Sequence, residues 1–222
     1  MRKPVLIALF TLCLATVSLQ AQQATRPPER RFSYGLFAGV NHTGAYLPTS
    51  LTRQVNPLAG VDLQYHLTPR SSLHLQPSWT QVSSDNAKSQ LYAGASYALR
   101  LAMLKVPVLY RYYIGENRKL FFVQAGGSYN LLTNSNFWQE YYVQCFVGPC
   151  PPVLALNGAA SNKSAISGIA GLGFNIELQR VSIPITFQYE RSITSYLFPS
   201  QFDAPPTAVK FDTFSLTTGV NF

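Results

Sequence analysis

Hydrophobic and polar residues alternate along most of the chain after residue 31. In residues 210–222, for example, Phe214 and Leu216 fall on one face of an extended strand, whereas Ser215 and Thr217 fall on the other. Such a strand needs an apolar environment on one side only. The alternation therefore predicts β-strands that each have one apolar face and one small, polar face.

Eight segments carry this pattern: residues 32–41, 58–67, 72–82, 99–113, 120–132, 164–178, 182–193 and 210–222. Long connectors follow the first, third, fifth and seventh segments, and tight turns follow the second, fourth and sixth. Membrane β-barrels have this asymmetry, with long outer loops and short periplasmic turns. We therefore predict an all-β fold, an eight-stranded antiparallel up-and-down transmembrane β-barrel with four long outer loops and three tight periplasmic turns.

The N-terminus carries the longest apolar run of the chain. Arg2 and Lys3 precede the apolar residues 5–17, and small and polar residues follow up to Ala21. This order is typical of a secretory signal peptide, and the run is shorter than the roughly 20 residues that a transmembrane helix needs. We therefore predict a signal peptide at residues 1–21, a short periplasmic segment at residues 22–31 and an outer-membrane barrel at residues 32–222.

The composition agrees with a membrane location. Charged residues make up 12% of the chain and aromatic residues 13%, whereas soluble proteins contain about 25% charged residues. The net charge of +8 falls to +6 once Arg2 and Lys3 leave with the signal peptide. Because the remaining basic residues are scattered and the chain is exported, we expect no nucleic-acid partner. We predict a monomeric barrel in contact with outer-membrane lipid.

Most charged residues within the strands fall on the polar faces, which should point into the lumen. Eight strands leave an interior that side chains fill, and a charge buried there must be paired. We therefore predict no open pore and a lumen polar network. Its predicted members are Asp62, His66, His74, Lys105, Arg111, Glu177 and Glu190.

His66 and His74 lie on the inward faces of two neighbouring strands, and Asp62 shares that face. One interpretation is a metal site or an acid–base pair. The other is a set of lumen histidines that only form hydrogen bonds. We favour the second interpretation and expect no metal, no cofactor and no catalytic residues.

Three short segments carry a family resemblance: LKVPVLYRY at residues 104–112, FVQAG at residues 122–126 and YGLFAG at residues 34–39. They resemble strands of the PorT-like small outer-membrane β-barrel family of Bacteroidetes. Lys105 stands where that family usually has an acidic residue. The resemblance implies an outer-membrane location and no shared catalytic residues. For one class of members it also implies a part in protein secretion or gliding machinery.

Cys145 and Cys150 flank a turn sequence in the longest connector, residues 133–163. An oxidising compartment favours a disulfide, and closing so small a loop would contribute roughly 2 kcal/mol of stability. Free or metal-bound thiols are the alternative, although two cysteines alone make a poor metal site. We predict a disulfide.

The same connector is rich in aromatic residues, namely Phe137, Trp138, Tyr141 and Tyr142. Aromatic side chains are enriched at binding hot spots, and loops on rigid scaffolds carry function. The alternative is that they fold onto the barrel mouth or enter the lipid interface. We predict a non-catalytic scaffold or interaction protein, an accessory of a secretion or uptake complex that contacts a protein partner through its long outer loops.

Two other functions are also compatible with the sequence. Some outer-membrane barrels modify lipids with a histidine, a serine and an acid near the outer rim, and His42 begins the first long connector. A soluble lipocalin-like binder also has eight strands, but its apolar faces would line an internal cup. Outward apolar faces would therefore indicate a membrane barrel, and inward apolar faces would indicate a soluble binder.

Overall fold

The computed structural model describes residues 31–46, 54–85, 95–115, 120–141, 153–178, 181–198 and 206–222. Its strands are β1 (Phe32–Tyr46), β2 (Gln54–Thr68), β3 (Ser71–Leu75), β4 (Ser78–Asp85), β5 (Ala95–Ile114), β6 (Phe121–Tyr141), β7 (Val153–Gly158), β8 (Ser164–Glu177), β9 (Ser182–Ser192), β10 (Tyr196–Phe198) and β11 (Thr207–Asn221). Among these residues, none forms a helix that could cross a membrane. The predicted signal peptide at residues 1–21 lies outside the described residues.

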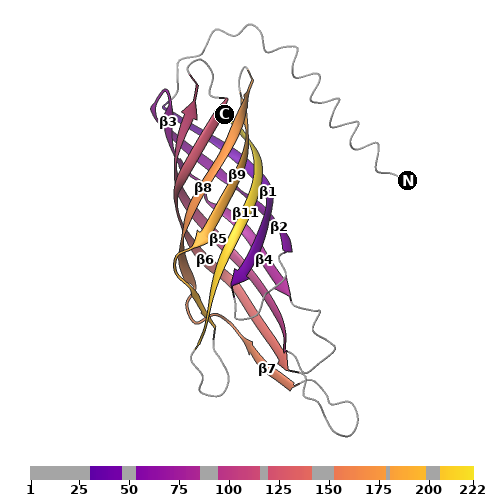
Figure 1. Cartoon of the computed structure of the whole chain (residues 1–222). Coiled ribbons are helices and arrows are strands. Elements are labelled where there is room, and N and C mark those ends of the chain that lie inside the picture. The colour runs from indigo at the N-terminus through magenta and orange to yellow at the C-terminus, as the bar shows by residue number, and fades with distance from the viewer. Residues whose placement is uncertain are drawn as a thin grey trace, which may run out of the picture.

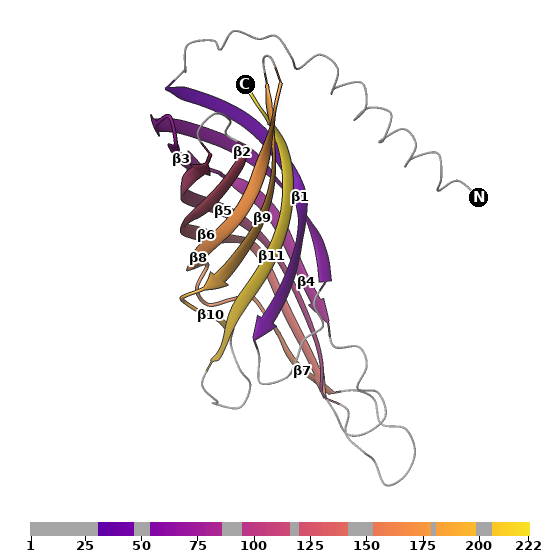
Figure 2. The ribbon, with the colours of Figure 1, turned by 45° about the horizontal axis from the view of Figure 1, so that its top comes forward.

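Antiparallel pairing joins the strands into a closed ring (Figures 1 and 2). The order around the ring is β1, β2, β3 with β4, β5, β6, β8, β9 and β11, and β11 pairs back onto β1. The closing seam runs from Gly35 opposite Asn221 to Tyr46 opposite Lys210. Because β3 and β4 occupy one place in the ring, the predicted eight-stranded barrel is confirmed.

The third strand of the ring is interrupted at Gln76 and Pro77, which separate β3 from β4. Proline has no N–H to donate and interrupts a strand ladder. The Pro77 carbonyl still accepts a hydrogen bond from the N–H of Val61 (3.0 Å), and the N–H of Gln76 donates to the carbonyl of Pro107 (3.1 Å). The wall therefore stays hydrogen-bonded to both neighbouring strands across the break.

The apolar faces of the strands point away from the barrel interior. Exposed hydrophobic residues occur on every ring strand; examples are Leu36, Val61, Trp79, Val108, Val123, Leu172, Phe187 and Leu216. The alternate positions are buried and mostly polar in the half of the barrel near the short turns; examples are Asp62, His74, Arg111, Gln124, Asn175 and Thr217. The soluble lipocalin-like alternative is therefore wrong, because it requires the opposite orientation.

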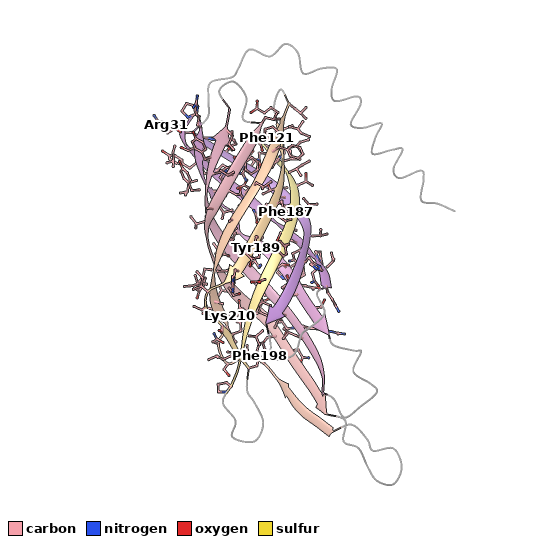
Figure 3. All side chains as sticks on the ribbon, viewed as in Figure 1. Arg31, Phe121, Phe187, Tyr189, Phe198 and Lys210 are labelled. Atoms are coloured by element: carbon pink, nitrogen blue, oxygen red, sulfur yellow. The ribbon has the colours of Figure 1, made fainter. Side chains whose placement is uncertain are left out.

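The two ends of the barrel differ. The C-terminus and β3 lie at one end, and β7 lies at the other (Figure 1). Arg31 and Phe121 mark the first end, and Phe198 lies toward the opposite one (Figure 3). Gly115 follows β5 at the first end with a φ of 117°, a conformation that favours glycine. Because short turns are periplasmic in bacterial barrels, we assign the first end to the periplasm.

Exposed aromatic side chains occur toward both ends of the wall, as in the aromatic girdles of outer-membrane barrels. Near the periplasmic end they are Tyr65, Tyr110, Tyr112, Phe121 and Phe222, and toward the outer end they are Trp79 and Tyr129. Tyr189 is half-buried and packs 5.0 Å, centroid to centroid, from the ring of Phe214.

Several strands run beyond their predicted outer ends. β5 and β6 pair from Ile114 opposite Phe121 to Ala95 opposite Tyr141, and β7 pairs with β6 from Phe137 opposite Gly158. The predicted connector at residues 133–163 therefore begins as strand and contains the short strand β7. The prediction placed the outer ends of β5 and β6 too early because the exposed residues described there, such as Arg100, Asn134 and Asn136, are polar and carry no apolar alternation.

The outer part of the barrel interior is apolar, which corrects the prediction of a polar lumen throughout. The residues of this apolar cluster are Val82, Leu99, Leu101, Met103, Leu132, Ala160, Ala165, Tyr196, Phe198, Val209 and Phe211. Tyr196 and Phe198 belong to β10, which lies within the predicted connector at residues 194–209 and pairs with β11. Three residues are too few for an alternation to be recognised in the sequence.

Closure of the ring gives a testable prediction at Gly39. A Cβ at this position would lie 2.1 Å from the carbonyl oxygen of Leu216 and 2.8 Å from the Cα of Thr217, on the closing strand. We expect Gly39→Val to destabilise the folded barrel by about 1–3 kcal/mol or more, because the two backbones must move apart. The measurement is the fraction of heat-modifiable, folded protein on a gel across a urea series.

The matched control is Ala38→Val. Ala38 is exposed on the lipid-facing side of the same strand, so the added methyl groups meet no backbone. Equal urea midpoints for the two variants would show that the seam tolerates a larger residue at position 39.

Candidate functional site in the barrel interior

The periplasmic half of the interior holds a hydrogen-bonded group that we call the Asp62 cluster: Asp62, Gln64, Ser72 and His74. The Nδ1 atom of His74 lies 3.0 Å from Oδ1 of Asp62, and its Nε2 atom lies 2.8 Å from Oγ of Ser72. Gln64 donates from Nε2 to Oδ2 of Asp62 at 2.8 Å. Ser72 and His74 are 0% exposed. The cluster forms because β2 and β3 are neighbours and each contributes alternate, inward residues.

Arg111 on β5 adds a positive charge beside this cluster. It is 1% exposed, and the strand register places it opposite Ser72. Its Nε donates to Oε1 of Gln124 at 3.0 Å, and its Cζ lies 3.9 Å from the centroid of the Phe122 ring. The aromatic face and the amide thus hold the guanidinium in place within the wall.

A second polar group lies nearer the middle of the barrel, and we call it the Glu190 cluster: Lys105, Asn130, Ser167 and Glu190. The Nζ of Lys105 is 2.6 Å from Oε2 of Glu190. Oε1 of Glu190 accepts hydrogen bonds from Nδ2 of Asn130 (2.9 Å) and from Oγ of Ser167. Its members come from β5, β6, β8 and β9, so the buried ion pair connects strands across the lumen.

The structure thus brings together Asp62 with His74 and Lys105 with Glu190. His66 is opposite Ser72 in the strand register; it is half-buried, and its Nε2 atom is 3.2 Å from Oγ of Ser33. Glu177 ends β8 and is exposed, so it does not belong to the buried groups. A strand's last inward position lies at the mouth of the barrel, where water reaches the side chain.

Sequence reasoning missed Ser72 as a partner of His74. The signal was present, because residues two apart on a strand share a face. Aspartate, histidine and serine in this order also resemble the relay that activates a nucleophilic hydroxyl. Here both Ser72 and His74 are fully buried in the wall. The arrangement can hold a proton and neutralise charge, but a substrate cannot reach the hydroxyl of Ser72.

The apolar cluster closes the interior on the outer side of the Glu190 cluster. A cavity of about 10 Å³ lies between them, lined by Lys105, Glu190 and Tyr196 among others; such a volume is close to that of one water probe. Burial, and the negative charge of Glu190, raise the pKa of Tyr196. The Tyr196 hydroxyl therefore stays protonated over the physiological pH range.

His42 lies within β1, which corrects its predicted place in a loop. It is opposite Phe214 on one side and Val55 on the other. It is half-buried, and its buried neighbours Asn41 and Thr43 face the interior. His42 therefore lies on the outward face of the wall, alongside apolar residues.

The predicted partner-binding residues divide into two groups. Phe137, Trp138 and Tyr141 lie on β6, whose backbone pairs with β5 and β7. Tyr142 and the predicted disulfide partners Cys145 and Cys150 lie outside the described residues. Within the ranges that the structure describes, no three His, Cys, Asp or Glu residues are grouped in a way that suits a metal ion.

The closed ring, the apolar exterior and the filled interior define an outer-membrane β-barrel protein. The chain belongs to the family described as outer membrane protein beta-barrel domain, whose profile matches residues 20–197. Its location is the cell outer membrane. A search of curated proteins found no match.

Three solved structures illustrate the similarity. OprG from Pseudomonas aeruginosa is 16% identical, with 86% of this chain and 95% of that chain covered and a TM-score of 0.45. CarO from Acinetobacter baumannii is 17% identical, with 85% and 96% covered and a TM-score of 0.42. Ail of Yersinia pestis, solved with the heparin analogue sucrose octasulfate, is 11% identical, with 87% and 100% covered and a TM-score of 0.44.

The Glu190 cluster gives a second testable prediction. Glu190→Gln leaves the Lys105 charge buried without its counter-charge, and losing one partner of a buried ion pair costs about 3–5 kcal/mol. We expect a corresponding fall in the urea midpoint of the heat-modifiable band. The double variant Lys105→Met with Glu190→Gln should recover part of the loss, because no uncompensated charge remains.

Glu177→Gln is the matched control. It removes the same charge from the exposed end of β8 and should leave the urea midpoint near that of the wild type. A Glu190→Gln variant as stable as the Glu177→Gln variant would mean that the ion pair does not support the barrel.

Proposed function

We propose that this protein is a non-catalytic outer-membrane interaction protein of the PorT-like kind. In this proposal the barrel is a monomeric anchor, exported by a signal peptide at residues 1–21. Its outer extension contacts a protein partner at the cell surface, as an accessory of a secretion or uptake complex. The observation that carries the proposal is the sheet formed by β5, β6 and β7 beyond the lipid-facing part of the wall.

This extension lies on the outer side of Leu104 on β5 and Tyr129 on β6, which are the outermost exposed apolar residues of these strands among those whose exposure is described. From there β5 and β6 remain paired out to Ala95 and Tyr141, and β7 adds a third strand. The extended hairpin and β7 are visible at the lower end of the barrel (Figure 2). Two paired strands continuous with the barrel wall give a rigid support, which is what a docking surface requires.

The edge of this sheet also supports the proposal. Among the described residues, β7 pairs with β6 only, so one edge of β7 has backbone N–H and C=O groups available for another strand. Exposed sheet edges accept an extended segment of a partner. Phe137, Trp138 and Tyr141 on β6 and Tyr142 beyond it would add aromatic contacts. A Cys145–Cys150 disulfide would fix the segment between β6 and β7.

A non-catalytic role is favoured over a lipid-modifying enzyme for two reasons. The only serine–histidine–aspartate group found in the described residues, that of Ser72, is sealed inside the wall. His42 projects from the outward face among apolar neighbours instead of from a loop above the membrane.

The docking role is tested by deleting residues 142–158, which removes β7 and the segment before it. We expect a photo-crosslinker at Trp138 to capture a defined protein band in the wild type, and this band to be lost in the deletion variant. Deletion of residues 86–94, between β4 and β5, is the control. The proposal is rejected if both deletion variants fold and give the same crosslinked band as the wild type.

The filled interior gives a separate prediction about transport through the barrel. Because the inward side chains of the two polar clusters and the apolar cluster are buried against one another, we expect purified wild-type protein to give no stable conductance steps in a planar bilayer. Replacing Tyr196 and Phe198 by alanine opens only the apolar cluster. This variant should also give no conductance steps, because the Lys105–Glu190 pair still blocks the lumen. Stable steps in the wild type would contradict a purely anchoring role.

A further inference from the structure

A cavity of about 530 Å³ lies on the wall where β4, β5 and β6 leave the lipid-facing region. Two rows of paired residues form it. Ser83, Arg100 and Asn136 make one row, and Gln81, Ala102 and Asn134 make the row beside it. Directly paired residues of a sheet share a face, so all six side chains point the same way.

That face is the outward one. Gln81, Arg100, Asn134 and Asn136 are exposed, whereas the residues between them on β4 and β5, such as Val82 and Leu101, are buried in the apolar cluster. Ala102 is the smallest of the six and lies between two longer amide side chains. The small Ala102 side chain therefore leaves a hollow between the longer polar ones. Gln54 on β2 and the apolar residues Val82, Leu99 and Leu101 also line it.

The next row toward the periplasm is apolar. Trp79 is paired with Leu104, and Leu104 is paired with Leu131; Trp79 and Leu104 are 44% and 37% exposed. An exposed tryptophan at the end of an apolar band is typical of a membrane interface. The cavity therefore begins where the hydrocarbon ends, at the level of the outer-leaflet head groups.

The cavity has the chemistry of a phosphate and sugar site. The guanidinium of Arg100 can donate two parallel hydrogen bonds to a phosphate. The amides of Gln81, Asn134 and Asn136 offer donors and acceptors for sugar hydroxyls, whereas the Ser83 hydroxyl already lies 2.7 Å from acceptor oxygens of Gln54 and Asn56. None of the described residues that line the cavity is acidic, so its charge is positive. Its volume lies in the usual range of small-molecule sites, about 300–1,000 Å³.

We propose that this cavity binds the phosphorylated sugar head group of an outer-leaflet glycolipid, with Arg100 on the phosphate and Gln81, Asn134 and Asn136 on the sugar. The acyl chains would then continue along the apolar row of Trp79, Leu104 and Leu131. The protein would hold one lipid in a fixed position beside the β5–β6 extension.

A second arginine near the outer end provides a control. Arg191 is exposed on β9, and its Nε lies 3.9 Å from Oδ1 of Asp212. Its side chain is 70% exposed, and Gly168 and Asp212 are its strand partners. Arg191 therefore has a similar charge near the same membrane surface, but it has a carboxylate beside it and does not line the cavity.

The test is native mass spectrometry of the full-length protein, purified in detergent and titrated with hexa-acylated lipid A. We expect Arg100→Gln to weaken binding about tenfold or more, the size of one lost hydrogen bond to a charged group. Ala102→Trp should also weaken binding, because it fills the hollow without changing charge. Arg191→Gln should bind like the wild type.

Each variant is first shown to be folded by its heat-modifiable band, and Arg100→Lys replaces Arg100→Gln if the latter does not fold. Dephosphorylated lipid A should bind the wild type as weakly as lipid A binds Arg100→Gln. Inorganic phosphate should not compete at equal concentration. The proposal is overturned if Arg100→Gln and Arg191→Gln bind equally, if Ala102→Trp binds like the wild type, or if inorganic phosphate displaces the lipid.

Discussion

Backbone N–H and C=O groups inside a lipid bilayer must find partners within the protein, because no water is present there to bind them. In this chain the requirement is met by the seam between β1 and β11, where residues far apart in the sequence pair from Gly35 opposite Asn221 to Tyr46 opposite Lys210. Without that seam, two strand edges would face hydrocarbon. The close approach at Gly39 shows how tightly the two strands are joined.

Closure with eight strands has consequences for the interior. The ring is so narrow that side chains fill it, and each buried polar group needs a partner within reach. Two solutions are used at different depths. Hydrogen-bonded groups around Asp62 and Glu190 fill the periplasmic and middle parts, while apolar side chains and the β10 strand fill the outer part. Near the outer mouth, apolar filling excludes water without any need for matched charges.

The sequence was sufficient to predict the ring, because alternation and connector length both follow directly from bilayer physics. It also placed Asp62, His74, Lys105 and Glu190 on inward faces. It did not predict which of them pair, since that depends on register between strands distant in the sequence; Lys105 and Glu190 are 85 residues apart.

Other features could not be predicted because no periodic signal marks them. β10 has three residues, and β7 and the outer parts of β5 and β6 lie beyond the lipid, where either face can be polar. For Glu177, the sequence predicted the inward face of the strand but not its place at the exposed end of β8. Alternation shows which face a side chain is on, but it does not show how far the residue lies from the barrel mouth.

The outer part of the wall is therefore where selection for function is least constrained by the membrane. Below the row of Trp79, Leu104 and Leu131, each outward residue must suit hydrocarbon and each inward residue must suit a filled lumen. Beyond that row the outward residues no longer need to suit hydrocarbon, although inward residues such as Leu99 and Leu101 still fill the interior, and β5 and β6 stay paired out to Ala95 and Tyr141. The paired outer parts of β5 and β6 carry the Arg100 cavity near the membrane and the edge of β7 near their outer ends. A lipid held in the cavity would restrain the tilt of these strands relative to the membrane surface, and so the direction in which the edge of β7 is presented.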